Sequence, residues 1–199
     1  MRYSFVLPRH TVAILVNVWH NYNIMKIQII GYAGSGKSTL ARKLGEIANI
    51  PVLHLDNTHY YGDWQERTAE EQSEIVRAFI SQNDSWVMDG NYTSVATERF
   101  AMTDLTIFMD FNRWHCFFSA YRRARKYRGT SRPDLPCPDK FDRSFRRWIL
   151  VDSRTKAFRE KILGNLNATN GRKVVLKNRR QVKAFLQEFQ QSFGTTATK

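Results

Sequence analysis

The chain has 199 residues, of which 42% are hydrophobic and 25% charged, a balance that excludes a wholly disordered chain and fits one domain of ordinary size. Lys and Arg number 31 against 18 Asp and Glu, and 20 of the basic but only 5 of the acidic residues lie between positions 113 and 180. The net charge of +13 favours polyanionic partners such as nucleotide phosphates, nucleic acid or an acidic membrane surface, without choosing among them.

Residues 1–24 are predicted to lie outside the fold, as an extension or a mis-assigned start. Their apolar run at 11–19 is shorter than the roughly 20 residues that a membrane helix needs, and no small-residue cleavage site follows it. Residues 25–190 are then expected to form a single domain, and residues 191–199 a flexible tail.

Only two cysteines occur, Cys116 and Cys137. They are too few for a disulfide framework and are not in metal-ligand spacing, so they are expected to be ordinary core or surface thiols in a reducing compartment. We therefore expect a cytoplasmic protein with no membrane partner, either a monomer or a homodimer.

The predicted secondary structure alternates strands with helices. Runs of β-prone apolar residues predict strands at 26–30, 50–56, 85–90, 105–111 and 173–177. Apolar residues at helical spacing predict helices after position 38, at 68–82, at 113–127, through Phe145 and Phe158, and at 180–189. Thr68 and Glu71 form a capping box at the start of the second helix, and the proline-rich segment 129–140 is expected to be irregular.

This alternation predicts an α/β fold. Parallel strands need long crossovers, so a five-stranded parallel sheet with helices on both faces is expected. Ligands of such sheets bind beyond the carboxyl ends of the strands, which is where the loop after the first strand lies.

The stretch GYAGSGKSTL, positions 31–40, follows the first strand and precedes a helix, and it matches G-x-x-x-x-G-K-[ST], the phosphate-binding P-loop. Glycines allow positive φ and turn N–H groups inward as an anion nest, and the helix N-terminus adds its dipole. Lys37 is expected to reach the β and γ phosphates of ATP, and Ser38 to give a hydroxyl to Mg²⁺. The predicted nucleotide-binding residues here are Gly31, Gly34, Ser35, Gly36, Lys37, Ser38 and Thr39.

A second candidate metal ligand follows the third predicted strand. A carboxylate at the end of a strand beside the P-loop strand can hold Mg²⁺ through water, and Asp89 in WVMDGNY is the candidate. The alternative is that Asp89 caps the turn before Gly90. Asp110 is the competitor and ranks lower, because DFN resembles a helix N-cap. No N-K-x-D guanine-reading segment occurs, which disfavours a GTPase.

GYAGSGKSTLA, HLD, WVMDGNY and the basic YRRARKYRGTSRPD, in this order, resemble the nucleoside-monophosphate-kinase-like P-loop proteins. They are most similar to the bacterial proteins described as DNA topology modulation proteins and related to adenylate kinase. The resemblance runs from Met25 to about Phe189. It implies a P-loop NTPase fold with a five-stranded core, ATP binding and a kinase-type site with a small basic lid, and it leaves the acceptor open.

One departure concerns the acceptor. Adenylate kinases carry D-G-[FY]-P-R where this chain has Asp89, Gly90, Asn91 and Tyr92. The arginine expected to grip a nucleoside monophosphate is therefore missing, which argues against AMP as the acceptor.

The resemblance also implies a lid at about 120–147 that opens with an arginine-bearing helix. Positioned cations stabilise the charge on a transferring phosphoryl group. Arg123 and Arg132 are the predicted catalytic arginines, and Arg128 is a predicted nucleotide-binding residue; a solvated helix face is the alternative for each. The same basic wall contains Arg122, Arg125, Arg143, Arg146 and Arg147.

Asp56 lies where related small-molecule kinases place a carboxylate that orients or deprotonates the acceptor hydroxyl, so the resemblance implies a catalytic role. Its surroundings, HLDNTHYYGDW, suit a polar small molecule or a base. The alternative is a strand-end Asp that caps its own loop. His54 and His59 are expected to be structural, because no third metal ligand lies at suitable spacing.

The leading hypothesis is a Mg·ATP-dependent kinase that transfers the γ-phosphoryl group to an unidentified small acceptor. The second is a nucleotide-switched regulator that binds nucleic acid nonspecifically through its basic half, where Trp114, Tyr121 and Trp148 lie among arginines. No helix-turn-helix, zinc-finger or OB-fold signature occurs that would indicate recognition of a specific nucleic-acid sequence. A third is an ATP-binding subunit without turnover.

Overall fold

The computed structural model describes residues 25–62, 64–132 and 134–194, with the backbone alone for Ser131 and Arg132. The predicted extension at 1–24 and the last five residues of the predicted tail lie outside the described residues. Within the described part, no helix combines the length and apolar composition needed to cross a bilayer.

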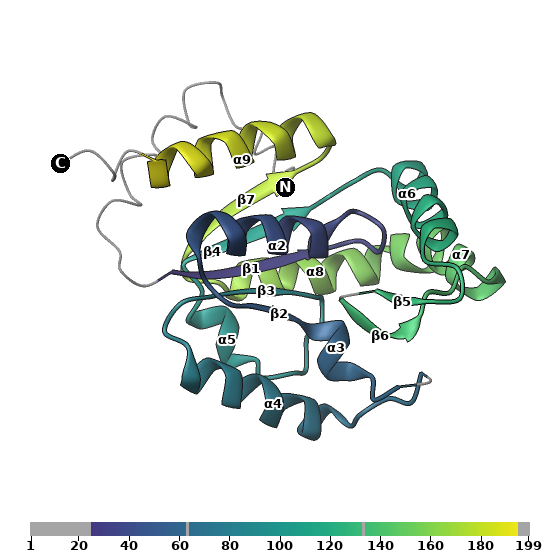
Figure 1. Cartoon of the computed structure of the whole chain (residues 1–199), viewed down its shortest axis with the longest axis horizontal. Coiled ribbons are helices and arrows are strands. Elements are labelled where there is room, and N and C mark those ends of the chain that lie inside the picture. The colour runs from purple at the N-terminus through teal and green to yellow at the C-terminus, as the bar shows by residue number, and fades with distance from the viewer. Residues whose placement is uncertain (1–24, 63, 133, 195–199) are drawn as a thin grey trace.

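The central sheet has five parallel strands in the order β2-β3-β1-β4-β7 (Figure 1). Their bounds are β1 Lys26–Gly31, β2 Val52–His54, β3 Trp86–Asp89, β4 Leu105–Met109 and β7 Arg172–Leu176. In the parallel register, Ile29 on β1 pairs with Asp89 on β3. Strand β1 therefore lies at the centre of the sheet, and the predicted α/β class is confirmed.

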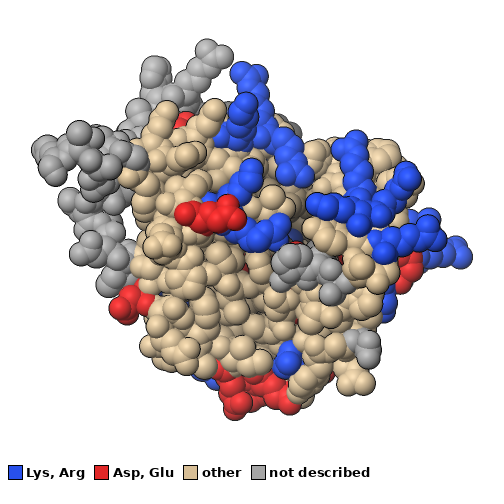
Figure 2. All heavy atoms as spheres, viewed as in Figure 1, with Lys and Arg blue, Asp and Glu red and all other residues tan. Residues whose placement is uncertain are grey.

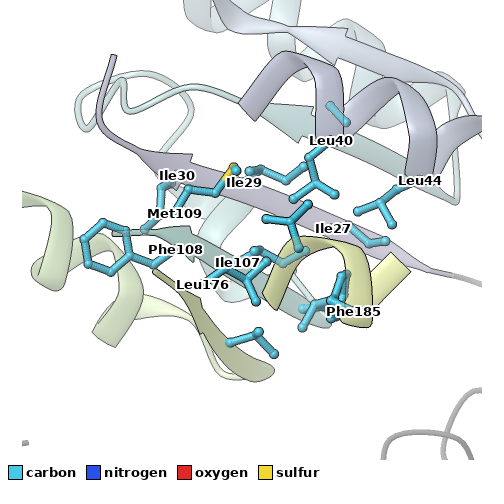
Figure 3. Packing of buried hydrophobic residues seen from close by; sticks show 14 of the residues in the cluster. Ile27, Ile29, Ile30, Leu40, Leu44, Ile107, Phe108, Met109, Leu176 and Phe185 are labelled. Atoms are coloured by element: carbon cyan, nitrogen blue, oxygen red, sulfur yellow. The ribbon is translucent and has the colours of Figure 1, made fainter. Parts of the chain in front are cut away.

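Helices cover both faces of this sheet. They are α2 Lys37–Ala48, α3 Leu55–His59, α4 Ala69–Gln82, α5 Glu98–Ala101, α6 Arg113–Lys126, α7 Arg143–Leu150, the 3-10 turn η2 Asp152–Arg154, α8 Lys156–Ala168 and α9 Arg179–Gly194. Alternate side chains of a strand point to opposite faces. On β1, Ile27 and Ile29 lie beneath Leu40 and Leu44 of α2 (Figure 3). Gln28 points to the other face, where it meets Arg99 of α5.

The structure confirms the predicted capping box at the start of α4. The Glu71 N–H donates to Thr68 Oγ1 at 3.2 Å, and the Thr68 N–H donates to Glu71 Oε2 at 2.7 Å. Both predicted thiols, Cys116 and Cys137, are free and buried.

The predicted strand at 50–56 is too long. Strand β2 ends at His54, and the next residues form the short helix α3. A continuous apolar run occurs both in buried strands and in buried helical turns, so this pattern alone does not distinguish the two. Leu55 is fully buried, and its carbonyl accepts one hydrogen bond from Thr58 Oγ1 within the turn and another from Gln72 Nε2 of α4. Asp56 therefore stands in the first turn of a helix rather than at a strand end.

Two further predictions are wrong in detail. The segment expected to be irregular contains a small antiparallel hairpin, β5 Ser131–Arg132 with β6 Leu135–Pro138. The prolines of β6 fall on its exposed positions, where a missing N–H costs little. The predicted tail is helical up to Gly194, because Ser192 is buried and the Phe193 ring packs 5.0 Å from Phe189.

Candidate active site

A cavity of about 1300 Å³ opens beyond the carboxyl ends of the strands. The loop after β1, helix α3, the loop after β3, helix α6, the β5–β6 hairpin and α7–α8 all contribute to its lining. Among the predicted site residues, those that line the cavity are Gly34, Gly36, Lys37, Ser38, Thr39, Asp56 and Arg123. The topology thus brings together side chains from both halves of the chain.

The glycine-rich loop has the backbone that an anion nest needs. Gly34 has φ +77°, and a Cβ there would lie 2.3 Å from the carbonyl oxygen of Cys116, so only glycine fits. Gly36 is the left-handed N-cap of α2, and α2 has neither a capping side chain nor an acidic residue in its first turn. The positive end of this helix is therefore left for an anion. Ser35 Oγ is buried with no hydrogen-bond partner among the described residues.

Lys37 lies over this loop. Its ammonium group donates to the Tyr32 carbonyl oxygen at 3.1 Å. Desolvation by burial lowers the pKa of Lys37, while the charges of Asp56 and Asp89 act in the opposite direction. The side chain therefore lies near both candidate carboxylates, and an incoming phosphate would stabilise its charge.

Ser38 and Asp89 are in direct contact. Ser38 Oγ donates to Asp89 Oδ2 at 2.9 Å, and Asp89 is only 5% exposed. The other carboxylate oxygen is hydrogen-bonded to His54 Nδ1. A serine hydroxyl beside a strand-end carboxylate, next to a phosphate-binding loop, fits a Mg²⁺ ion that also takes water and phosphate oxygens. No group of three or more His, Cys, Asp or Glu side chains that could hold a metal occurs in the described residues.

Asp110, the competing carboxylate, is engaged elsewhere. Arg159 grips both of its oxygens, at 2.9 and 3.0 Å. The hydrogen bond to Asp110 raises the pKa of Arg159. The N-cap of α6 is Asn112, whose side chain accepts from the Trp114 N–H.

The sequence did not single out Asn91, which fastens the start of the P-loop. The Gly31 N–H donates to Asn91 Oδ1 at 2.8 Å, and Asn91 Nδ2 donates to the Gly31 carbonyl oxygen at 2.7 Å. One amide side chain thus binds both backbone polar groups of Gly31, beyond the point where the pairing of β1 with β3 ends. Its partner is 60 positions away, so no local pattern could reveal the contact.

A buried arginine holds the loop that carries Asn91. Arg99 is 0% exposed, and it donates to the carbonyl oxygens of Tyr92 and Ala96 and, at 3.4 Å, to Gln28 Oε1. Burial lowers the pKa of Arg99 to about 10. Since a buried charge is stable only when its donors are satisfied, Arg99 fixes the path of residues 92–96.

Asp56 of α3 also lines the cavity. The Tyr92 hydroxyl donates to Asp56 Oδ1 at 2.9 Å. Burial, followed by the charge of Asp56, raises the pKa of Tyr92, and burial raises the pKa of Tyr60 to about 12. Both phenols therefore stay protonated near neutral pH, and the Tyr92 hydroxyl is a hydrogen-bond donor to Asp56. His59 is held by Gln72 Oε1 at 3.3 Å and packs on Tyr60 and Tyr92.

The arginines of the predicted lid differ in their positions. Arg123 binds both oxygens of Asp139, at 2.9 and 3.2 Å, and Arg42 of α2 contacts Asp134 at 3.3 Å, so two ion pairs attach the hairpin to the rest of the cavity wall. Arg128 is exposed and is not part of the described lining. Arg132 belongs to β5, and its side chain lies outside what the structure describes.

Two other arginines lie against the P-loop, and no motif marks them in the sequence. The Arg154 guanidinium is 3.6 Å from the centre of the Tyr32 ring, and its Nη2 is buried without a partner among the described residues. Arg179 Nη1 would lie 3.3 Å from a Cβ on Gly36, and its Nε donates to His115 Nε2 at 3.2 Å. Both add positive charge beside the loop.

No protein-family model and no curated protein matches this chain. Among solved structures, an uncharacterized protein from Eubacterium ventriosum superposes with a TM-score of 0.50 at 16% identity, over 86% of this chain and 98% of that one. A shikimate kinase from Bacteroides thetaiotaomicron gives 0.49 at 18% identity, over 84% and 97%. A gluconokinase from Sinorhizobium meliloti gives 0.46 at 12% identity, over 87% and 93%. At these identities only the fold is comparable.

Proposed function

We propose that this protein is a magnesium-dependent phosphotransferase, which binds ATP at the P-loop and transfers the γ-phosphoryl group to a hydroxyl of a small acceptor. The observation that carries the proposal is the hydrogen bond of 2.9 Å between Ser38 Oγ and the buried Asp89 Oδ2, where Ser38 and Asp56 line the same cavity. It joins a phosphate-binding loop to the carboxylate of the adjacent strand, as metal-assisted phosphoryl transfer requires.

Each side chain has a definite task in this reaction. Lys37 and the N-terminus of α2 would bind the phosphate oxygens, and Arg123 would neutralise charge on the transferring group once it leaves Asp139. Asp56 would accept the proton of the acceptor hydroxyl, whose oxygen then bonds to the γ-phosphorus. The bond to the β–γ bridging oxygen breaks, and its electron pair leaves with ADP.

The metal would be held by Ser38, Asp89 and phosphate oxygens. When bound, Mg²⁺ would neutralise developing charge on the phosphate oxygens. The His54 hydrogen bond orients Asp89, so that its other oxygen faces Ser38. Lid closure over the cavity would exclude water, which otherwise competes with the acceptor for ATP.

Lys37→Ala tests the proposal. Calorimetry with Mg·ATP measures binding, and γ-labelled ATP with a panel of nucleosides, sugars and hydroxy acids measures transfer. The exposed Lys43, on the same helix, provides the control Lys43→Ala. We expect Lys37→Ala to reduce transfer by about 10²-fold or more and Lys43→Ala to leave it unchanged. A fully active Lys37→Ala protein, or wild type that binds no nucleotide at millimolar concentration, would refute the proposal.

Nonspecific nucleic-acid binding is a second candidate, which one observation favours. On α6, Trp114, Phe118 and Tyr121 are 56%, 53% and 42% exposed, and Figure 2 shows Lys and Arg gathered on the side of α6 and α7. Exposed rings among cations can stack bases and follow a phosphate backbone. The test measures the affinity of wild type and of Trp114→Ala for single-stranded DNA at increasing salt concentration. An affinity that vanishes near physiological salt would count against nucleic-acid binding. An affinity that is the same in Trp114→Ala as in wild type would also count against it.

A further inference from the structure

The acceptor end of the cavity is aromatic and acidic. Its lining from α3 to the loop after β3 is formed by Asp56, His59, Tyr60, Trp64, Gly90, Asn91, Tyr92, Thr93 and Ser94. Not one of these described residues is Lys or Arg. The only charged side chain that this part of the chain contributes to the lining is therefore the Asp56 carboxylate.

The basic residues nearest in sequence to these lining residues are Arg67 and Arg99, and both bind groups of the protein. Arg67 donates to the carbonyl oxygens of Thr58 and Tyr60, and its guanidinium lies 4.0 Å from the centre of the Tyr61 ring. Arg99 is fully buried among backbone carbonyls. Neither is among the lining residues, so neither offers its charge to a ligand.

Aromatic rings pack against one another at this end of the cavity. Tyr60 and Trp64 meet edge to face at 5.1 Å, and His59 lies 4.8 Å from Tyr92. The Lys140 ammonium lies 4.2 Å from the centre of the Trp64 ring, so this ring already attracts a cation. The faces of such rings are electron-rich and repel anions, while they bind cations and apolar ring faces.

We propose that this end of the cavity selects an uncharged or positively charged hydroxyl compound with a ring face, such as a nucleoside or an amino sugar, and rejects phosphate monoesters and carboxylates. This inference rests on the proposed function and names the class of its acceptor. An anionic acceptor would place its charge beside Asp56 without a matching cation from α3 or the β3 loop, which is unfavourable in a partly buried site.

The cations that line the same cavity come from other elements: Lys37 and Arg42 of α2, Arg122, Arg123 and Lys126 of α6, Lys140 after β6, and Lys161 of α8. Lys37 interacts with the charge of Asp56, but the proposed function assigns its ammonium group to the ATP phosphates. Arg123 and Arg42 are paired with Asp139 and Asp134 of the lid segment. Lys140 is exposed, and its ammonium group contacts the Trp64 ring. An anionic acceptor beside the aromatic rings would pair with Lys140. A substitution of Lys140 therefore distinguishes an anionic acceptor from a neutral or cationic one.

The test uses matched acceptors that differ in charge: adenosine against adenosine 5′-monophosphate, and glucosamine and glucose against gluconate. Binding is measured by calorimetry with a non-hydrolysable ATP analogue and magnesium present, and transfer is measured with γ-labelled ATP. We expect the neutral or cationic member of a pair to be favoured by about tenfold or more in kcat/KM or Kd. Asp56→Asn should abolish transfer to it, and Lys140→Met should leave its binding intact.

Preference for an anionic member, together with its loss in Lys140→Met, would overturn this inference while leaving the phosphotransferase proposal standing. If no member of any pair binds although the ATP analogue does, the assignment of a small-molecule acceptor to this end is overturned. Failure to bind the ATP analogue itself would instead overturn the proposed function.

Discussion

Asn91 provides a sharp test of how the P-loop is held. Asn91→Ala removes two hydrogen bonds to Gly31, of 2.8 and 2.7 Å, and leaves the polar groups of this buried residue without their partners. At about 1 kcal/mol for each bond, the free energy of unfolding should fall by about 2 kcal/mol. For a chain of this size, that is a decrease in Tm of about 4 to 8 °C. Because Gly31 begins the loop, affinity for Mg·ATP should fall as well.

Thermal denaturation followed by circular dichroism measures the first effect, and calorimetry with Mg·ATP the second. Asn83→Ala is the matched control, since Asn83 Nδ2 also bonds a backbone carbonyl, that of Phe79, at 2.8 Å at the end of α4. It should lower Tm without a change in nucleotide affinity. If Asn91→Ala retains both the Tm and the affinity of wild type, the amide is not a support of the loop and the reasoning fails.

Three other variants test further parts of the structure. Asp89→Asn should abolish the magnesium dependence of nucleotide binding, whereas Asp110→Asn should retain it. Nucleotide titrations with and without magnesium measure this dependence, and the opposite result would make Asp110 the metal ligand. Arg99→Met should lower the free energy of unfolding by about 3 kcal/mol, because it leaves buried acceptors unpaired; an unchanged Tm would contradict this. Thr68→Ala should cost about 1 kcal/mol in denaturant unfolding, and a change in nucleotide affinity would be unexpected for a cap remote from the loop.

The sequence predicted the features that depend on local pattern. The glycine-rich loop and the Thr68 capping box could be read because their residues are close together in the chain and their spacing follows from backbone geometry. The five strands were found for the same reason, through apolar runs.

Features that depend on distant contacts could not be read in this way. Asn91 bonds a residue 60 positions away, and Arg99 meets Gln28 across 71 positions. In the sequence Arg99 looks like one more surface cation, and only its burial gives it a structural role. Helix α3 was missed because Leu55 continues an apolar run, although its carbonyl closes a helical turn.

The positions of Asn91 and Tyr92 have one more consequence. Asn91 is hydrogen-bonded to Gly31, and Tyr92 is hydrogen-bonded to Asp56, so one peptide bond separates a contact with the glycine-rich loop from a contact with the proposed catalytic carboxylate. Any ligand that rigidifies one contact also restrains the other. If the proposed function holds and the nucleotide tightens acceptor binding through these contacts, thermodynamic reciprocity requires the acceptor to tighten nucleotide binding by the same factor.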